Sequence, residues 1–315
     1  MNILEFGERA RAEIAKAVQG QEATVEGLLV AVLSGGHVLL EGAPGIAKTL
    51  LARTVAHCLG CDFKRIQFTP DMMPSDVVGT NVFDMRQAEF HLHKGPIFAE
   101  LLLADEVNRT PPKTQAALLQ AMEEHTATID GVDYDLGSVF TVFATQNPIE
   151  HEGTYPLPEA QTDRFMLKID MPYPSEAEER AILRRHHRGF DPHDVVAAGV
   201  EPLTDASELI KLRQQLRDIQ VDEALLGYMI EIVRRSRGAF QVAFGASPRA
   251  QIALLHGGKA LAALRGRDYV IPDDVKDLAP AVLRHRLLLQ PEAEIEGVTS
   301  NQVIANLLDE IDVPR

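Results

Sequence analysis

A glycine-rich turn near residue 42 limits the possible folds of this chain more strongly than any other feature of its sequence. The turn follows the apolar run 37–40 and precedes a helical run at 50–56. Strand, glycine-rich turn and helix, in this order, form a phosphate-binding loop, in which backbone N–H groups and the positive end of the helix face phosphate oxygens. The expected nucleotide-binding residues are Gly42, Ala43, Pro44, Gly45, Ile46, Ala47, Lys48, Thr49 and Leu50.

Three residues at the end of this loop decide its chemistry and its shape. Lys48 is placed to reach the β- and γ-phosphates of a nucleotide, and the Thr49 hydroxyl is placed to bind Mg²⁺. The usual pattern has a glycine where this chain has Ala47. Because alanine disfavours a positive φ, we expect the loop to pass Ala47 with ordinary backbone angles. A chance glycine-rich turn is the alternative, and the rest of the chain decides between the two.

Two neighbouring acids follow a buried strand later in the chain. The apolar run 101–104 is typical of a parallel strand that helices cover on both faces. Asp105 and Glu106 come at its carboxyl end, where α/β sheets bind ligands. We expect Asp105 to orient Mg²⁺, directly or through water, and Glu106 to polarise the water that attacks the γ-phosphate. A pair of solvated acids at a strand end is the alternative.

Two further polar residues lie at strand boundaries. Asn147 follows the apolar run 139–145, so it falls beside the acids if the two strands are neighbours, where it could hold the attacking water or sense the γ-phosphate. A loop-capping Asn is the alternative. Arg164 lies between a short helix and the strand predicted at 166–171, and its rigid guanidinium could enter the nucleotide site of a neighbouring subunit. An ion pair with Asp163 or Glu159 is the alternative.

The chain divides into three parts by composition and periodicity. Residues 1–188 alternate helical and strand patterns and predict an α/β core, residues 189–205 are rich in Gly, Pro and Asp and predict a linker, and residues 206–315 predict an all-helical domain. Within the core, 80–93 and 126–136 predict two hairpins, which are often contact devices when exposed. In the helical domain, Arg249 comes in the first turn of a helix that begins at Pro248, and it would point towards phosphate. A solvated arginine is the alternative there.

Bulk composition excludes several classes of protein. The net charge of −15, with only local basic clusters, argues against a nucleic-acid partner. No stretch reaches the ~18 apolar residues of a membrane span, and residues 1–6 lack the start of a signal peptide, so we expect a cytoplasmic location. Cys58 and Cys61 form a C-x-x-C pair without a second pair to complete a zinc site, and we expect two unpaired thiols.

Taken together, these motifs resemble the MoxR family of AAA+ ATPases. The resemblance extends over nearly the whole chain and is carried by residues 41–49, 101–109, 144–150, 152–161 and 163–165. It implies a P-loop AAA+ core with a five-stranded parallel sheet in an αβα sandwich, an all-α lid domain, and an ATP- and Mg-dependent homo-oligomeric ring, usually a hexamer. Members of the family often carry Ala where this chain has Ala47. The two hairpins match the family's helix-2 and pre-sensor inserts.

The resemblance also implies a role for each candidate residue. Lys48 and Thr49 are then Walker A, Asp105 and Glu106 are Walker B, and Asn147 is the first sensor. Arg249 is the sensor of the lid, and Arg164 is the arginine finger, with Arg109 as the alternative finger.

The family's partners are protein clients and von Willebrand factor A domain proteins, and its work is chaperone-like remodelling or metal-cofactor insertion. A magnesium or cobalt chelatase ATPase subunit, a nucleotide-dependent scaffold and a nucleic-acid motor remain the alternatives. A motor should carry Lys or Arg at its hairpin tips, where this chain offers Arg86.

Overall fold

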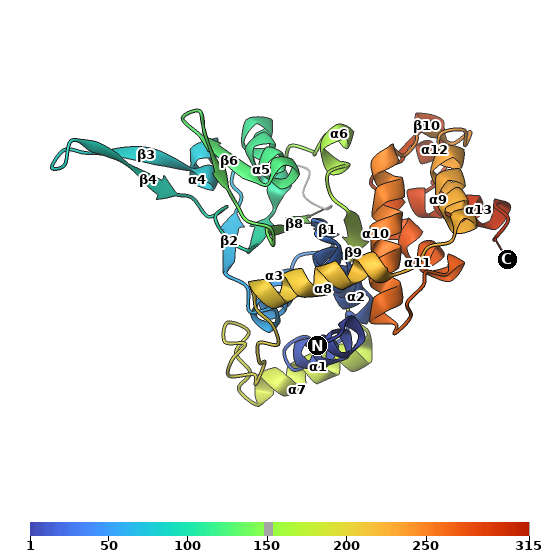
Figure 1. Cartoon of the computed structure of the whole chain (residues 1–315), viewed down its shortest axis with the longest axis horizontal. Coiled ribbons are helices and arrows are strands. Elements are labelled where there is room, and N and C mark those ends of the chain that lie inside the picture. Colours follow the sequence, from blue (N-terminus) through green and yellow to red (C-terminus); the bar gives the residue numbers. More distant parts are fainter. Residues whose placement is uncertain (148–153, 315) are drawn as a thin grey trace.

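A five-stranded parallel sheet lies at the centre of the computed structural model, which describes residues 1–147 and 154–314 (Figure 1). Its strands run in the order β2-β5-β8-β1-β9. They are β1 (Val38–Glu41), β2 (Phe63–Gln67), β5 (Leu101–Asp105), β8 (Thr141–Gln146) and β9 (Leu167–Asp170). The predicted parallel core is confirmed. Because β5, β8 and β1 are neighbours, their carboxyl ends meet at one edge of the sheet.

Helices cover both faces of the sheet, as the apolar runs of the strands require. Leu101 and Leu103 of β5 pack into one core cluster with α1 (Ile3–Ala15), α2 (Glu22–Ser34) and α3 (Lys48–Cys58). Leu102 and Ala104 point the other way, into a second cluster with α4 (Pro74–Val78) and α5 (Pro112–Glu124). This alternation produces the predicted αβα sandwich. A short 3₁₀ helix, η1 (Val107–Arg109), joins β5 to α5.

Two antiparallel hairpins extend from the core, as predicted. The first consists of β3 (Gly79–Asp84) and β4 (Glu89–Lys94), and the second of β6 (Thr126–Ile129) and β7 (Val132–Asp135). The β3–β4 hairpin projects away from the body of the molecule (Figure 1). Several of its apolar side chains are exposed, among them Val82, Phe83, Met85 and Phe90.

The remaining helices follow β8 and β9. They are α6 (Glu159–Thr162), α7 (Glu176–His187), α8 (Ala206–Gln215), the 3₁₀ helix η2 (Leu216–Asp218), α9 (Glu223–Ser236), α10 (Pro248–Leu264), α11 (Pro272–Leu283), α12 (Pro291–Ile295) and α13 (Ser300–Glu310). The C-terminal part is helical, with one addition to the expectation. A short antiparallel pair, β10 (Val242–Phe244) and β11 (Leu288–Leu289), joins two of its loops.

The segment between α7 and α8 packs on the core rather than running free as a linker. The Leu203 N–H donates to the Cys58 carbonyl at 2.8 Å, and the His57 ring Nε2 lies 3.1 Å from the Val200 carbonyl oxygen. Val195 and Val200 are buried. These contacts fix the segment against the carboxyl end of α3.

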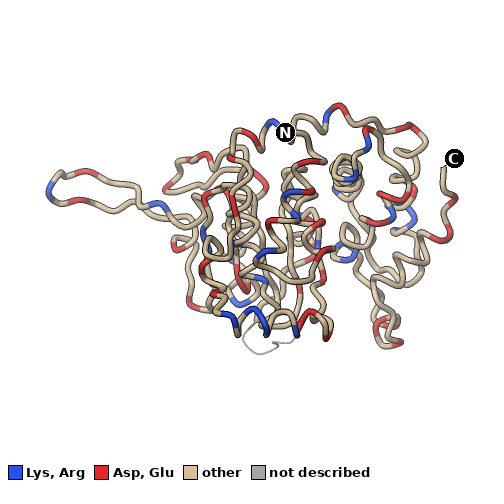
Figure 2. Tube along the Cα trace, turned by 90° about the horizontal axis from the view of Figure 1, so that it is seen from below, with Lys and Arg blue, Asp and Glu red and all other residues tan. Residues whose placement is uncertain are grey.

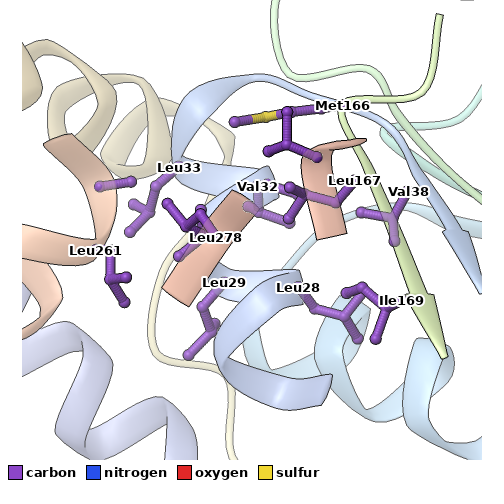
Figure 3. Close-up of a cluster of buried hydrophobic side chains, with 14 of the residues drawn as sticks. Leu28, Leu29, Val32, Leu33, Val38, Met166, Leu167, Ile169, Leu261 and Leu278 are labelled. Carbon is purple, nitrogen blue, oxygen red and sulfur yellow. The ribbon is translucent and has the colours of Figure 1, made fainter. Parts of the chain in front are cut away.

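Helix α2 joins the C-terminal helices to the sheet. Figure 3 shows Leu28 of α2 near Ile169 of β9, and Leu33 near Leu278 of α11. All of these side chains belong to one buried cluster, together with Leu261 of α10. The apolar contact fixes the position of α10 and α11 beside the edge strand β9.

The cysteines and the helix lengths agree with the composition. Cys58 and Cys61 are free, and burial raises the pKa of both thiols to about 12. Both are therefore protonated at neutral pH. Within the described residues, every helix is too short or too polar to cross a lipid bilayer.

Candidate functional site

The loop between β1 and α3 has the shape of a phosphate-binding loop, with one departure from expectation. Gly45 has φ +82° and Ala47 has φ +67°. The expectation of ordinary backbone angles at Ala47 is wrong, because Ala47 is the residue through which the loop turns into α3. A left-handed residue with a Cβ costs about 1 kcal/mol. The first turn of α3 holds it there, since the Leu51 N–H donates to the Ala47 carbonyl at 2.9 Å.

The first two residues of α3 face the loop and the neighbouring strand. Lys48 Nζ donates to the Gly42 carbonyl at 2.7 Å, so the ammonium group lies folded over the loop. Thr49 Oγ1 lies 3.3 Å from Asp105 Oδ2, at the end of β5. The hydroxyl and the carboxylate predicted to hold one cation are therefore adjacent.

Asp105 is buried, and two further side chains fix its carboxylate. Thr145 of β8 donates its hydroxyl to Oδ1 at 2.5 Å. Arg65 of β2 donates to Oδ2 from Nε at 3.1 Å and from Nη2 at 2.8 Å. The Arg65 side chain is 42% exposed, so it can move towards solvent without unpacking the core.

Glu106 is held in an uncommon backbone conformation, with φ +57°. Its N–H donates to Thr145 Oγ1 at 2.8 Å. One carboxylate oxygen, Oε2, accepts from Gln67 Nε2 at 2.6 Å and from Arg109 Nη1 at 3.0 Å. Strain of this kind at a polar residue is typical of functional sites. The contact also places Arg109, the alternative arginine finger, beside an acid of its own chain.

A cavity of about 510 Å³ joins the predicted residues. Its lining contains Pro44, Gly45, Ile46, Ala47, Lys48, Thr49 and Leu50 of the loop, Asp105 and Glu106 after β5, and Asn147 after β8. Asn147 is 4% exposed. Three segments that lie far apart in the sequence thus meet around one cavity, in the arrangement that the motifs predict.

The other end of the cavity comes from residues that the sequence motifs did not identify. It is formed by Ala17, Val18, Gln19, Gln21, Ile182, Arg185, His186, Phe190, Pro192 and His193. The Arg185 guanidinium lies over the Phe190 ring at 4.5 Å, and burial lowers the pKa of Arg185. An apolar wall with a few polar groups suits a nucleobase. The break after α1 and the aromatic residue in a Gly- and Pro-rich segment were the available signals, and neither forms a motif.

Arg164 and Arg249 lie outside this cavity. Arg164 Nη2 pairs with Glu123 Oε2 of α5 at 2.9 Å. The alternative, an ion pair of Arg164, is therefore present, but its partner is Glu123 and not Asp163 or Glu159. Arg249 pairs with the same Glu123 and lies 3.8 Å from Asp163. Both arginines line a second hollow of about 230 Å³ that shares no residue with the first.

The expectation that Arg249 points into its own phosphate site is therefore wrong. Helix α10 packs on α2, beyond the edge strand β9, so its first turn reaches the segment before β9 instead of the loop after β1. A pattern in the sequence of α10 cannot show this, because it depends on how the lid packs on the core.

The donor set near the loop fits Mg²⁺. In residues 1–147 and 154–314 no three His, Cys, Asp or Glu side chains cluster to hold a metal. The Thr49 hydroxyl and the Asp105 carboxylate are hard oxygen ligands at the cavity, and Mg²⁺ binds through one or two such ligands together with substrate phosphates.

Comparison with known proteins agrees with both parts of the fold. Residues 37–167 match a family model described as the ATPase family associated with various cellular activities (AAA), and residues 234–307 match the AAA lid domain. The chain is similar to Chaperone MoxR1 of Mycobacterium tuberculosis, with 44% identity over 98% of this chain and 82% of that protein.

Two further matches extend over similar lengths. The protein YeaC of Bacillus subtilis is 46% identical over 91% of this chain and 88% of its own length. The crystal structure of a candidate ATPase from Cytophaga hutchinsonii superposes with a TM-score of 0.90 at 40% identity, and the match includes 99% of this chain and 97% of that one.

Proposed function

Because this chain belongs to the MoxR family of AAA+ ATPases, we propose that it assembles into a ring that couples ATP hydrolysis to the remodelling of client proteins. The family hydrolyses ATP, and the 510 Å³ cavity is the site for the nucleotide. The observation that carries the proposal is that the loop, both acids and Asn147 meet at this cavity, whereas Arg164 and Arg249 face a separate hollow.

The residues of the cavity divide the work of phosphoryl transfer, which depends mainly on positioning and electrostatics. The Lys48 ammonium group leaves the Gly42 carbonyl and binds the phosphates. Asn147 holds the attacking water or senses the γ-phosphate. Glu106 orients and polarises that water after it releases Gln67 and Arg109. Thr49 and Asp105 would hold Mg²⁺, which neutralises phosphate charge when bound.

The arginines of the second hollow would act on a neighbouring subunit. A transition state that gathers charge on the γ-phosphate needs a cation, and an arginine finger supplies one. Arg109 pairs with Glu106, an acid that lines the cavity of its own chain. Arg164 lines a hollow that shares no residue with that cavity, which favours Arg164 as the finger, with Arg249 beside it. A ring repeats one head-to-tail interface, so each subunit would complete its neighbour's site.

The β3–β4 hairpin is the proposed contact with clients. Phe90 is 70% exposed and Met85 is 89% exposed, and the Phe83 and Phe90 rings pack on each other at 5.1 Å. Figure 2 shows acidic and basic residues side by side at its tip. Exposed aromatic residues with mixed charge fit an unfolded protein segment better than a phosphate backbone. Partnership with a von Willebrand factor A domain protein, metal-cofactor insertion, the hexamer and the cytoplasmic location stay predictions.

Steady-state phosphate release over a range of protein concentrations tests the proposal. We expect the specific activity to rise with concentration as the ring forms. Lys48→Ala should lose nucleotide binding, whereas Glu106→Gln should keep it and lose hydrolysis by about 100-fold or more. Glu124→Gln is the matched control, because this acid lies at the exposed end of α5. An activity that Glu106→Gln leaves intact, or that does not depend on concentration, would contradict the proposal.

A further inference from the structure

One arginine of the lid holds the segment that carries Arg164. Arg286 lies just after α11 and is 8% exposed. Its Nε donates to Asp163 Oδ1 at 2.7 Å, and its Nη2 donates to the carbonyls of Asp163 at 3.1 Å and Phe165 at 2.7 Å. Its Nη1 donates to the Met166 carbonyl at 3.2 Å and to the Val282 carbonyl. All five N–H groups of the guanidinium are therefore used.

The preceding residue, His285, completes the contact. Its carbonyl accepts from Thr162 Oγ1 at 3.1 Å, and its Nε2 donates to the Phe165 carbonyl at 3.0 Å. Residues 162, 163, 165 and 166 are thus all hydrogen-bonded to the end of α11. The Arg164 side chain instead points to α5, where it pairs with Glu123.

Asp163 links the same contact to the start of α10. Its carboxylate accepts from Ser247 Oγ at 2.9 Å and from Arg286 Nε, and Arg249 Nη1 lies 3.8 Å away. Two lid helices therefore meet at one carboxylate, directly beside Arg164. Burial lowers the pKa of Arg286, but its carboxylate partner acts in the opposite direction. The hydrogen bonds of Arg286, His285 and Ser247 to residues 162–166 thus form a rigid joint between lid and core.

We propose that Arg286 is a positioning residue that sets the direction of Arg164 and Arg249, so that the lid of one subunit controls hydrolysis in the next subunit's site. This inference rests on the proposed function, in which the two arginines act across the ring interface. A guanidinium with all of its N–H groups bonded fixes the backbone more firmly than an ammonium group can. A displacement of about 1 Å in a catalytic group can cost about 100-fold in rate, so loosening the joint should lower turnover.

Single variants test the first half of this inference. We expect Arg286→Met to lower phosphate release of the assembled ring about 10- to 100-fold. ATP affinity should stay within about twofold, since the substitution leaves the nucleotide cavity of the same subunit intact. Arg286→Lys should recover part of the loss. Asp163→Asn keeps the side-chain shape and should act in the same direction, which covers the case in which Arg286→Met folds poorly.

A matched control comes from the lid itself. Arg267 forms a bidentate pair with the buried Asp274, with both distances 2.6 Å, and it contacts neither hollow. Arg267→Met therefore breaks a comparable ion pair without touching the joint. It should lower stability but leave phosphate release per folded ring within about twofold. Equal losses of activity in Arg267→Met and Arg286→Met would overturn the positioning role.

Mixed rings test the second half. Arg286→Met mixed with Glu106→Gln should regain activity, because some interfaces then join an intact arginine pair to an intact cavity. A mixture of Arg286→Met and Arg164→Ala should not regain activity, because both substitutions impair the arginines and no interface then has an intact arginine pair. The reverse pattern, or no recovery in either mixture, would overturn the inference.

A reference mixture separates this failure from failure of the proposed function. Arg164→Ala with Glu106→Gln should recover if arginines act between subunits. If the reference mixture recovers activity but the mixture of Arg286→Met with Glu106→Gln does not, only the positioning role of Arg286 is contradicted. The mixture of Asp163→Asn with Glu106→Gln should give the same result as that of Arg286→Met. No recovery in the reference mixture removes the arginine that Arg286 was inferred to position, so both proposals fall together.

Discussion

Ala47 and Glu106 are non-glycine residues with positive φ, and both line the cavity of about 510 Å³. Such residues persist only where the surrounding structure fixes them. Ala47 is fixed by the first turn of α3, and Glu106 is fixed through Thr145. The phosphate-binding loop and Glu106 are thus held in set directions at the cavity.

Substitutions at Ala47 measure this strain. Ala47→Val should lower the free energy of unfolding by about 1–2 kcal/mol and weaken nucleotide binding, because a β-branched residue tolerates a left-handed backbone poorly. Ala47→Gly should be nearly neutral, since relief of strain is offset by the greater freedom of glycine in the unfolded chain.

Urea unfolding and nucleotide titration of each variant make the measurement. Ala12→Val, at an exposed position of α1, is the control for the substitution itself. If Ala47→Val proves no more damaging than Ala12→Val, the left-handed conformation at Ala47 is not required.

At the scale of elements, His37 ties the start of β1 to two neighbours. Its Nε2 donates to the Met122 carbonyl at 3.0 Å, and its Nδ1 accepts from the Val142 N–H of β8 at 3.0 Å. The ring is neutral in this arrangement, because a protonated Nδ1 cannot accept. Burial lowers the pKa of His37 to about 4.

Acid should therefore destabilise the fold through His37. Between pH 6.5 and 4 the unfolded chain binds a proton that the folded chain does not, so the free energy of unfolding falls as pH falls. The expected loss between pH 7 and pH 5 is about 2 kcal/mol. Burial also lowers the pKa of His285, which adds in the same direction.

Chemical unfolding at the two pH values, compared between the wild type and His37→Gln, isolates this contribution. The variant should be less stable at pH 7 and should lose less stability on acidification. Identical pH dependence in the two proteins would remove His37 as the cause.

The β3–β4 hairpin should bind clients without contributing to the fold. In the Glu106→Gln background, the double substitution Phe83→Ser and Phe90→Ser should lower the amount of client protein that co-purifies, because the exposed aromatic pair is lost. Stability should change by less than about 0.5 kcal/mol, as at other surface sites. Ile295→Ser, at an 87% exposed position of α12, is the control. Unchanged capture would mean that clients bind elsewhere.

The elements also show which features the sequence could predict. The loop, both acids and Asn147 were predictable because each follows a strand with a clear apolar pattern, and parallel strands end at one edge. Phe190 and Pro192 were missed because a Gly- and Pro-rich segment looks like a linker when its packing on α3 is unknown. Arg249 was misplaced, and Arg286 was missed, because their positions depend on how α10 and α11 pack against α2.

At the scale of the whole molecule, the proposed function divides the catalytic site between two neighbouring chains. The cavity holds the loop and the acids, and the hollow beside Glu123 holds Arg164 and Arg249. The lid packs on the core through α2 and through the joint at Asp163, so both sites belong to one body. In the proposed ring, a change at the cavity would therefore reach the next subunit through rigid packing.

Phosphate release by an equimolar mixture of Glu106→Gln and Arg164→Ala tests the central claim most directly. Each variant alone should be nearly inactive. In the mixture about a quarter of the interfaces should pair an intact cavity with an intact arginine, so activity should return towards that fraction of the wild type. No return of activity in a mixture shown to co-assemble, or full activity of Arg164→Ala alone, would contradict the account.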